Sequence, residues 1–281
     1  MASRATTTPV RLDGQAVLVT GGGRGLGRSF AHALAAAGAS VAVAARSAEQ
    51  LAETVDLIAR QGGHAVAFPL DVTDRHAVTQ MVGEVERQLG PISLLVNNAA
   101  VAAPLGPAWQ VEPDEWWHTL DINVRGTFLC AHAVLPGMVE RRRGRIINVA
   151  TTATVLAYGS AYGTSKAAII GFSEILAVET REYGIGVFAI NPGLVRTAMT
   201  EYLAYSAAGQ QWLPWGQALL EGGQALPPER AADLVLQLAA GRADSLSGRF
   251  LDVTDDIDAL LGRVEEITRD DLYTMRLRRK A

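Results

Sequence analysis

The sequence predicts an α/β fold in which one doubly wound, parallel sheet of about seven strands carries helices on both faces. Three observations support this fold class. Short, β-branched apolar runs alternate with helix-length segments along most of the chain, as in consecutive βα units. Several of these runs are apolar throughout, which is typical of strands buried on both faces. A glycine-rich turn directly follows the first run.

The order of the elements follows from these runs and from the residues that end them. Gly38 and Gly90 come after helix-length segments, where a helix end often needs a left-handed residue. The expected strands are 15–20, 40–45, 64–70, 92–96, 145–150 and 186–191, with a weaker seventh at 249–253. The expected helices are 25–37, 48–60, 74–89, 114–140 and 161–183.

A single domain accounts for most of the chain, because no linker, repeat or shift in composition divides it. Residues 1–10 are expected to form a disordered tail, and 11–253 the domain itself. Within the domain, 194–226 is too long and too rich in Tyr and Trp for a simple connector. We expect it to be a lid over a site or, as the alternative, a subunit contact. Residues 254–281 follow as a helical extension. The apolar positions that predict a terminal amphipathic helix there are Ile257, Leu260, Leu261, Val264 and Ile267.

Composition and charge exclude several classes of function. The net charge of −4 argues against a general nucleic-acid binder, and no apolar run reaches the ~20 residues that cross a membrane. Cys130 is the only cysteine, so no internal disulfide can form, and the histidines lack the spacing of metal ligands. The basic run 141–145 fits a helix end better than a polyanion site. Because no targeting signal is apparent, the cytoplasm is the expected location.

The glycine-rich turn has the features of a nucleotide-binding loop. It reads TGGGRGLG over 20–27, and its glycines let the backbone approach a phosphate closely. The helix that follows offers free amides and its positive dipole end to a pyrophosphate. The spacing of Gly21, Gly25 and Gly27 departs from the usual dinucleotide fingerprint, but its position predicts a nucleotide site of the Rossmann type.

The end of the second expected strand indicates which dinucleotide binds. Ala45 and Arg46 stand where folds that bind NAD usually place a carboxylate for the ribose hydroxyls. Arg46, together with Arg24 in the glycine turn, can instead pair with a ribose 2′-phosphate. The sequence therefore favours NADP(H) over NAD(H).

Tyr162 and Lys166 form a candidate catalytic pair. Lys166 is one of two lysines in a chain with 25 basic residues, and Tyr162 stands four positions earlier, on the same face of an expected helix. A nearby ammonium favours the phenolate, so we expect a lowered tyrosine pKa. Lysine suits this role as a compact charge on a flexible stem. The pattern alone is common on solvated helices, so it needs support from other motifs.

That support comes from motifs in a fixed order along the chain. Asn97-Asn98-Ala99 follows the fourth expected strand, Asn123 lies in the next helix and Pro192-Gly193 follows the sixth strand. With the glycine turn and the Tyr/Lys pair, this series resembles the classical short-chain dehydrogenase/reductase family. The resemblance implies that Tyr162 is the general acid or base and that Lys166 lowers its pKa and binds the nicotinamide ribose. It also implies that Asn123 holds a water linking Lys166 to solvent.

The resemblance implies further contacts with the cofactor. Asp71 and Val72 are expected at the adenine, and Thr197 at the nicotinamide carboxamide, near the backbone of Val195. The complete predicted cofactor site is Gly21, Gly23, Arg24, Gly25, Leu26, Gly27, Arg46, Asp71, Val72, Asn98, Ala99, Tyr162, Lys166, Pro192, Gly193, Val195 and Thr197.

One position departs from the family pattern. Thirteen residues before the tyrosine, where the family has its catalytic serine, this chain has Val149. If the segment before Tyr162 is two residues shorter than usual, Thr151 takes the serine position, and its hydroxyl can donate to a carbonyl oxygen. Thr152, Ser160 or a site without this donor are the alternatives.

The motifs together predict an NADPH-dependent reductase of a hydrophobic ketone or aldehyde, or the reverse alcohol dehydrogenase. One alternative is an enzyme of the same fold with another net reaction, such as an epimerase, a dehydratase or an imine reductase. The other is a non-catalytic protein that senses NADP(H). The resemblance also implies a homotetramer or homodimer. Neither a nucleic acid nor a membrane is expected as a partner.

Overall fold

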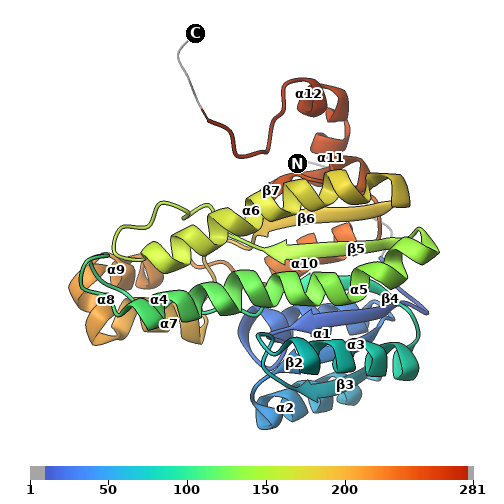
Figure 1. Cartoon of the computed structure of the whole chain (residues 1–281), viewed down its shortest axis with the longest axis horizontal. Helices are drawn as coiled ribbons and strands as arrows, with labels where there is room; N and C mark the ends of the chain where they lie inside the picture. The colour runs from blue at the N-terminus through green and yellow to red at the C-terminus, as the bar shows by residue number, and fades with distance from the viewer. Residues whose placement is uncertain (1–9, 278–281) are drawn as a thin grey trace, which may run out of the picture.

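Seven parallel strands form one sheet in the computed structural model, which describes residues 10–277. The strand order is β3-β2-β1-β4-β5-β6-β7, so the chain winds outward in both directions from the β1–β4 pair (Figure 1). The predicted doubly wound α/β fold is confirmed. The predicted N-terminal tail lies outside the described residues, apart from Val10.

The strands agree with the expected ones to within a few residues. Strands β1 and β6 are buried along their whole length, as expected for apolar runs covered on both faces. Their bounds are β1 Ala16–Thr20, β2 Ser40–Ala45, β3 His64–Pro69, β4 Ile92–Asn97, β5 Gly144–Val149, β6 Ile185–Asn191 and β7 Phe250–Asp252.

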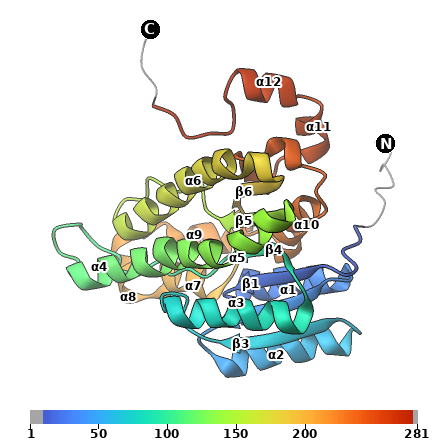
Figure 2. The same cartoon turned by 45° about the vertical axis from the view of Figure 1, so that its right-hand side comes forward.

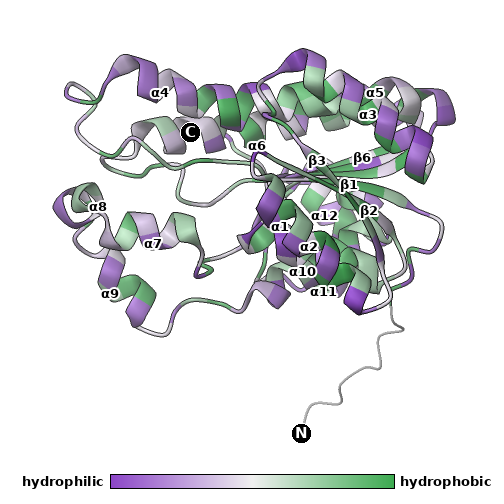
Figure 3. Ribbon diagram, turned by 90° about the horizontal axis from the view of Figure 1, so that it is seen from below, coloured by the Kyte–Doolittle hydropathy of each residue, from purple (hydrophilic) through white to green (hydrophobic). Residues whose placement is uncertain are grey.

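Helices cover both faces of the sheet (Figure 3). One face carries α1 (Gly25–Ala36), α2 (Ala48–Arg60) and α10 (Pro228–Ala239), and the other carries α3 (Arg75–Leu89), α5 (Thr127–Arg141) and α6 (Ser160–Thr180). Alternate strand residues divide between the two faces: Val17 and Val19 pack towards α1, whereas Leu18 packs on the other side. Two short 3-10 turns complete the layers, at Arg181–Tyr183 and Asp244–Leu246.

The segment expected as one helix over 114–140 is divided in three. Helix α4 (Pro113–Leu120) leads into a π-helical turn at Asp121–Gly126, and α5 then continues. Apolar spacing cannot distinguish such a turn from an α-helix, because the turn adds one residue without reversing the chain. The π-helical turn matters for the site because it contains the predicted site residue Asn123.

Three short helices make up most of the segment 194–226. They are α7 (Ala198–Tyr205), α8 (Ala207–Trp212) and α9 (Gly216–Glu221). With α4 they lie at one end of the molecule, beyond the carboxyl ends of the strands (Figures 1 and 3). This is the edge where parallel folds place their binding sites.

The C-terminal segment lies at the β7 side of the sheet (Figure 1), and Figure 2 shows α11 and α12 beyond β6. The prediction of one continuous helix is wrong, because the chain forms α11 (Ile257–Leu261) and α12 (Val264–Arg269) with a break at Gly262. Ile257 and Ile267 are nevertheless buried in the main core, so the apolar pattern correctly indicated packing. Beyond α12, the carbonyl oxygen of Tyr273 accepts a hydrogen bond of 2.8 Å from the Phe250 amide and covers part of the β7 edge.

Three further features of the structure concern the basic run, the single cysteine, and the membrane and metal sites considered from composition. Arg141 pairs with Glu86, and Arg142 ends α5 in a left-handed conformation, so the basic run lies at a helix end as expected. Cys130 is fully buried. Within 10–277, no helix is long and apolar enough to cross a membrane, and no group of acidic, His or Cys side chains could hold a metal ion.

Candidate active site

The glycine turn packs so tightly that two of its glycines cannot carry a side chain. A Cβ on Gly27 would overlap the carbonyl oxygen of Gly21, and one on Gly21 would stand 2.8 Å from Nδ2 of Asn98. Gly21 also has a positive φ of 64°. Nδ2 of Asn98 donates to the Thr20 carbonyl at 3.0 Å, so the predicted residue Asn98 braces the turn.

The turn leaves the N-terminus of α1 without a side-chain cap. Arg24 is the N-cap residue and makes no capping hydrogen bond, and the first turn of α1 has no acidic residue. By contrast, Ser47 and Asp74 cap α2 and α3. The first amides of α1 are thus free to bind an anion, and the closely packed glycines let it approach. These residues fit the pyrophosphate of a dinucleotide.

A side-chain brace beneath the turn was missed by the sequence analysis. Nε of Arg28 donates to the Gly23 carbonyl and to Oγ1 of Thr54, both at 3.0 Å. Oγ1 of the fully buried Thr54 in turn lies 3.0 Å from the Gly22 carbonyl. Arg28 also pairs with Glu53 at 2.7 Å. No spacing in the sequence indicates this contact between α1 and α2.

The two arginines predicted to select the cofactor are exposed. Neither Arg24 nor Arg46 has an ion-pair partner within the described part of the chain. Asp71 lies close enough to Arg46 to be affected by its charge. Burial raises the pKa of Asp71, but hydrogen bonds from Thr73 and the Arg46 charge outweigh it and leave the pKa lower than usual. Oδ1 of Asp71 accepts from the Thr73 amide at 2.9 Å, and Val72 beside it is buried.

Helix α6 brings the candidate catalytic pair, Tyr162 and Lys166, together in its first two turns. Nζ of Lys166 lies 5.7 Å from the centroid of the Tyr162 ring. Lys166 is 4% exposed and donates to the Val149 carbonyl at 2.7 Å, at the end of β5. The ammonium is therefore held by the backbone of the residue that stands at the family's serine position.

The pKa of the tyrosine differs from the sequence-based expectation. Burial raises the pKa of Tyr162 to about 12 and lowers that of Lys166 to about 8. Both groups lose the water that would solvate their charged forms, and this loss outweighs the attraction of an ammonium near the ring. The expectation that the nearby Lys166 ammonium gives Tyr162 a lowered pKa is therefore wrong for these side chains.

Asn123 is tied to the catalytic helix by hydrogen bonds. Its Nδ2 donates to Oγ of Ser165 and to the Val101 carbonyl, and its Oδ1 accepts from the Val101 amide, all at 2.9 Å. Oγ of Ser165 donates to the Tyr162 carbonyl at 2.7 Å. The Asn123 side chain thus connects the backbone of Val101 to helix α6. Its contact on α6 is Ser165, which the sequence analysis missed.

A second buried polar chain fixes α6 to the sheet. Nδ2 of Asn97 donates to Oδ1 of Asn148, and Nδ2 of Asn148 donates to Oγ of Ser173, each at 2.9 Å. Oγ of Ser173 donates to the Ile169 carbonyl at 2.7 Å. These side chains are almost fully buried, so the catalytic helix has a fixed position over β4 and β5.

The candidate donors that replace the family serine differ in their contacts. Oγ1 of Thr151 accepts from the Ala153 amide at 3.1 Å, which leaves its proton available for donation. Oγ1 of Thr152 accepts from Nδ2 of Asn191 at 3.5 Å. Oγ of Ser160 accepts from Nε1 of Trp116 in α4 at 3.1 Å.

The segment after β6 returns to the glycine turn. Pro192 and Gly193 end the strand, and Gly193 has a positive φ of 74°. Val195 pairs with Leu226 in an isolated parallel bridge. Thr197 caps α7, and its Cγ2 lies 3.4 Å from where a Cβ on Gly25 would stand. Of the predicted residues in this segment, Thr197 therefore lies beside the predicted phosphate loop.

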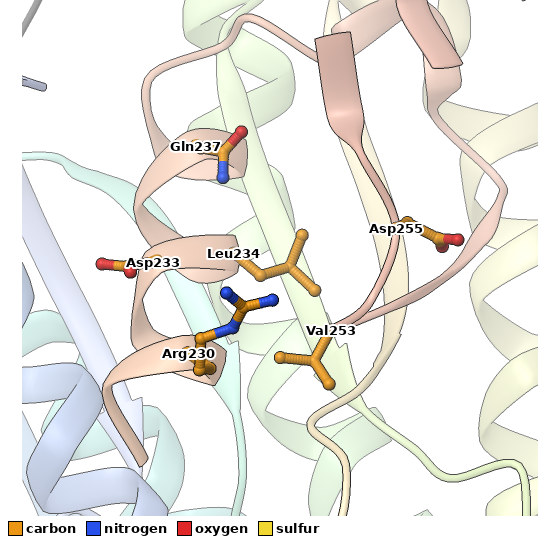
Figure 4. Close-up of a pocket in the computed structure, with 6 residues that line it drawn as sticks. All are labelled: Arg230, Asp233, Leu234, Gln237, Val253 and Asp255. Carbon is orange, nitrogen blue, oxygen red and sulfur yellow. The ribbon is translucent and has the colours of Figure 1, made fainter. Parts of the chain in front are cut away.

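A small hollow of about 150 Å³ lies between α10 and the residues after β7 (Figure 4). Arg230, Asp233 and Gln237 of α10 line it, with Val253 and Asp255 across from them. Because α10 covers the face of the sheet opposite α6, this hollow is separate from the catalytic pair. It contains none of the predicted site residues.

Comparisons with known proteins agree with this arrangement. The family model described as short chain dehydrogenase matches residues 15–207. A short chain dehydrogenase from Pseudocercospora fijiensis is 35% identical, covering 95% of this chain and 90% of the relative. A solved short-chain type dehydrogenase/reductase from Mycobacterium marinum has a TM-score of 0.78 at 32% identity, covering 86% of this chain and 94% of that one.

An actinorhodin polyketide ketoreductase, solved with NADPH, has a TM-score of 0.77 at 28% identity. The match covers 85% of this chain and 95% of the ketoreductase chain. The chain belongs to the short-chain dehydrogenase/reductase family. It is therefore an oxidoreductase of a family that binds NAD(P)(H) and acts on small molecules.

Proposed function

We propose that this protein is an NADPH-dependent oxidoreductase that interconverts a ketone or aldehyde with an alcohol. The observation that carries this proposal is the pairing of the partly buried Tyr162 with the buried Lys166 in the first turns of α6, with Nζ 5.7 Å from the ring centroid. When bound, NADPH supplies the hydride, and the uncapped N-terminus of α1 is where its pyrophosphate binds.

The tyrosine acts as the general acid in carbonyl reduction. Because burial raises the pKa of Tyr162 to about 12, the phenol stays protonated until the carbonyl oxygen becomes strongly basic. The phenol then gives its proton to that oxygen, and the Lys166 ammonium balances the phenolate that is left. Asn123 positions α6 through Ser165, and Thr151 donates a hydrogen bond to the carbonyl oxygen.

The exposed arginines support a preference for NADPH. Arg24 at the start of α1 and Arg46 after β2 are both exposed, and a guanidinium pairs well with a 2′-phosphate. The relative solved with NADPH has the same fold as this chain.

Replacing Tyr162 with Phe tests the proposed reaction. We expect the variant to lose turnover of NADPH on a panel of apolar ketones by several orders of magnitude, while NADPH still binds and quenches tryptophan fluorescence. Replacing the exposed Tyr183 with Phe is a matched control, since Tyr183 lies at the far end of α6. Wild-type turnover in the Tyr162 variant would refute the proposal.

A homodimer or homotetramer is also proposed. Phe128, Ile175 and Val178 are exposed apolar side chains on the outer surfaces of α5 and α6, which supports burial against a second copy. Sedimentation equilibrium measures the assembly, and a monomer at micromolar concentration would contradict this proposal.

A further inference from the structure

The unit α7–α9 (198–221) makes few contacts with the helices and strands of the sheet domain. Its helices pack against one another rather than against the helices and strands of the sheet domain. Its hydrogen bonds stay local: Tyr205 and Gln217 bond Glu221, Ser206 caps α8, and Thr200 returns to the Val195 carbonyl. Within 10–277, no hydrogen bond or ion pair reaches from 198–221 beyond this neighbourhood.

The unit is attached to the domain at its base. The Leu226 amide donates to the Leu194 carbonyl at 2.7 Å, and Val195 pairs with Leu226. This short ladder joins the two ends of the unit, so it can act as a hinge.

Away from the base, an aromatic contact connects the unit to the catalytic side. The Trp212 ring of α8 stacks on Tyr158, with centroids 5.0 Å apart and planes inclined by 37°. Tyr158 stands four residues before Tyr162, in the segment that leads into α6. Gly106 lies against the same contact, because a Cβ there would stand 3.7 Å from Nε1 of Trp212.

The backbone at Tyr158 is strained. Its φ of 63° is left-handed, a conformation that is unfavourable for a bulky residue. Two contacts hold it there: the Gly106 amide donates to the Tyr158 carbonyl at 2.8 Å, and the ring stacks on Trp212. Tyr158 is also 43% exposed, so the stack lies at the surface where it can open. Its opening would allow this strain to relax.

We propose that Tyr158 and Trp212 form an aromatic latch that holds the α7–α9 unit closed beside Tyr162. Opening of the latch then controls entry of the substrate and release of the product. The proposal rests on the proposed function only for the identity of the substrate. The contact itself is a property of the chain and can be tested without any turnover.

Hydrogen exchange measured by mass spectrometry tests the latch. An aromatic pair contributes about 0.5–1.5 kcal/mol, so Tyr158→Ala and Trp212→Ala should each raise exchange of the 198–221 amides about two- to tenfold. The double variant should exchange no faster than the single ones, because each removes the same contact. Tyr158→Phe keeps the ring and should match the wild type.

Trp215→Ala is the matched control, since Trp215 lies in the same unit but is 51% exposed and is not part of the stack. Equal exchange in wild type, Tyr158→Ala and Trp212→Ala would overturn the latch. So would an increase in Trp215→Ala as large as that in Trp212→Ala, because the unit would then be generally unstable.

Steady-state kinetics tests the link to the substrate. Because a weaker latch opens more often, kcat/KM for a bulky ketone should rise in Tyr158→Ala and Trp212→Ala, by at most the factor seen in hydrogen exchange. Faster exchange with an unchanged kcat/KM would overturn the role in substrate access. Failure of the proposed reaction would be seen separately, as full activity in Tyr162→Phe.

Discussion

Removing the Ser165 hydroxyl should affect both stability and catalysis. The hydroxyl accepts from Asn123 and donates to the Tyr162 carbonyl, at 2.9 and 2.7 Å, and both Ser165 and Asn123 are at most 1% exposed. Ser165→Ala leaves a buried amide proton of Asn123 without its partner, which costs about 1–3 kcal/mol. For a protein of this size the Tm should fall by roughly 2–10 °C.

The same substitution should lower kcat about tenfold, because a lost bond of about 1.4 kcal/mol frees Asn123 from the catalytic helix. Ser173→Ala is a closely matched control. Ser173 lies on the same helix, is 1% exposed, accepts from Asn148 at 2.9 Å and donates to Ile169 at 2.7 Å. We expect a similar loss of Tm with a smaller loss of kcat, because Ser173 lies further along α6 from Tyr162, whereas Ser165 bonds the Tyr162 carbonyl.

Thermal unfolding and steady-state reduction of one ketone measure both quantities in parallel. If both variants lose Tm equally and both keep kcat, Asn123 has no positioning role and the reasoning fails. If Ser165→Ala keeps its Tm, the buried hydrogen bond itself is absent.

Three further changes test other parts of the site. Arg46→Ala should raise the KM for NADPH about ten- to hundredfold, as for a lost charge-assisted bond, and leave the KM for NADH unchanged. Arg60→Ala is the control. Equal shifts in KM for both cofactors would contradict selection by Arg46. Thr54→Val should weaken NADPH binding severalfold in fluorescence titrations. Thr79→Val also removes a hydroxyl bonded to a helix carbonyl, and it should leave NADPH binding unchanged. The reduction rate should fall as pH rises through about 8, the lowered pKa of Lys166. Between this value and the ordinary pKa of 10.5, the unfolded chain binds more protons than the folded one, so Lys166 makes the free energy of unfolding rise with pH. If the reduction rate and the stability both fall as pH rises, the loss of rate comes from unfolding and not from Lys166.

The sequence predicted those features of the site that depend on local pattern. Apolar runs indicated the strands because both faces of a parallel sheet are buried. The spacing of Tyr162 and Lys166 indicated a shared helix face, and the glycine turn indicated a close backbone approach. Their roles in binding and catalysis stay predictions.

Other features depend on contacts between distant parts of the chain. Ser165 meets Asn123 only because a π-helical turn brings the two together, and Arg28 meets Thr54 only when α1 and α2 pack. The raised pKa of Tyr162 follows from burial, which no spacing reveals. The break at Gly262 was missed because the apolar positions on either side remain in helical register.

The local hydrogen bonding of 198–221 has a consequence for engineering. Because the hydrogen bonds of this unit are local, we expect that its residues can be exchanged for those of a relative without disturbing Tyr162, the proposed proton donor. The buried chain from Asn97 to Ser173 keeps α6 in register with the sheet. Chimeras that graft a foreign insert between Val195 and Leu226 should therefore acquire a new substrate range at an unchanged intrinsic rate of hydride transfer.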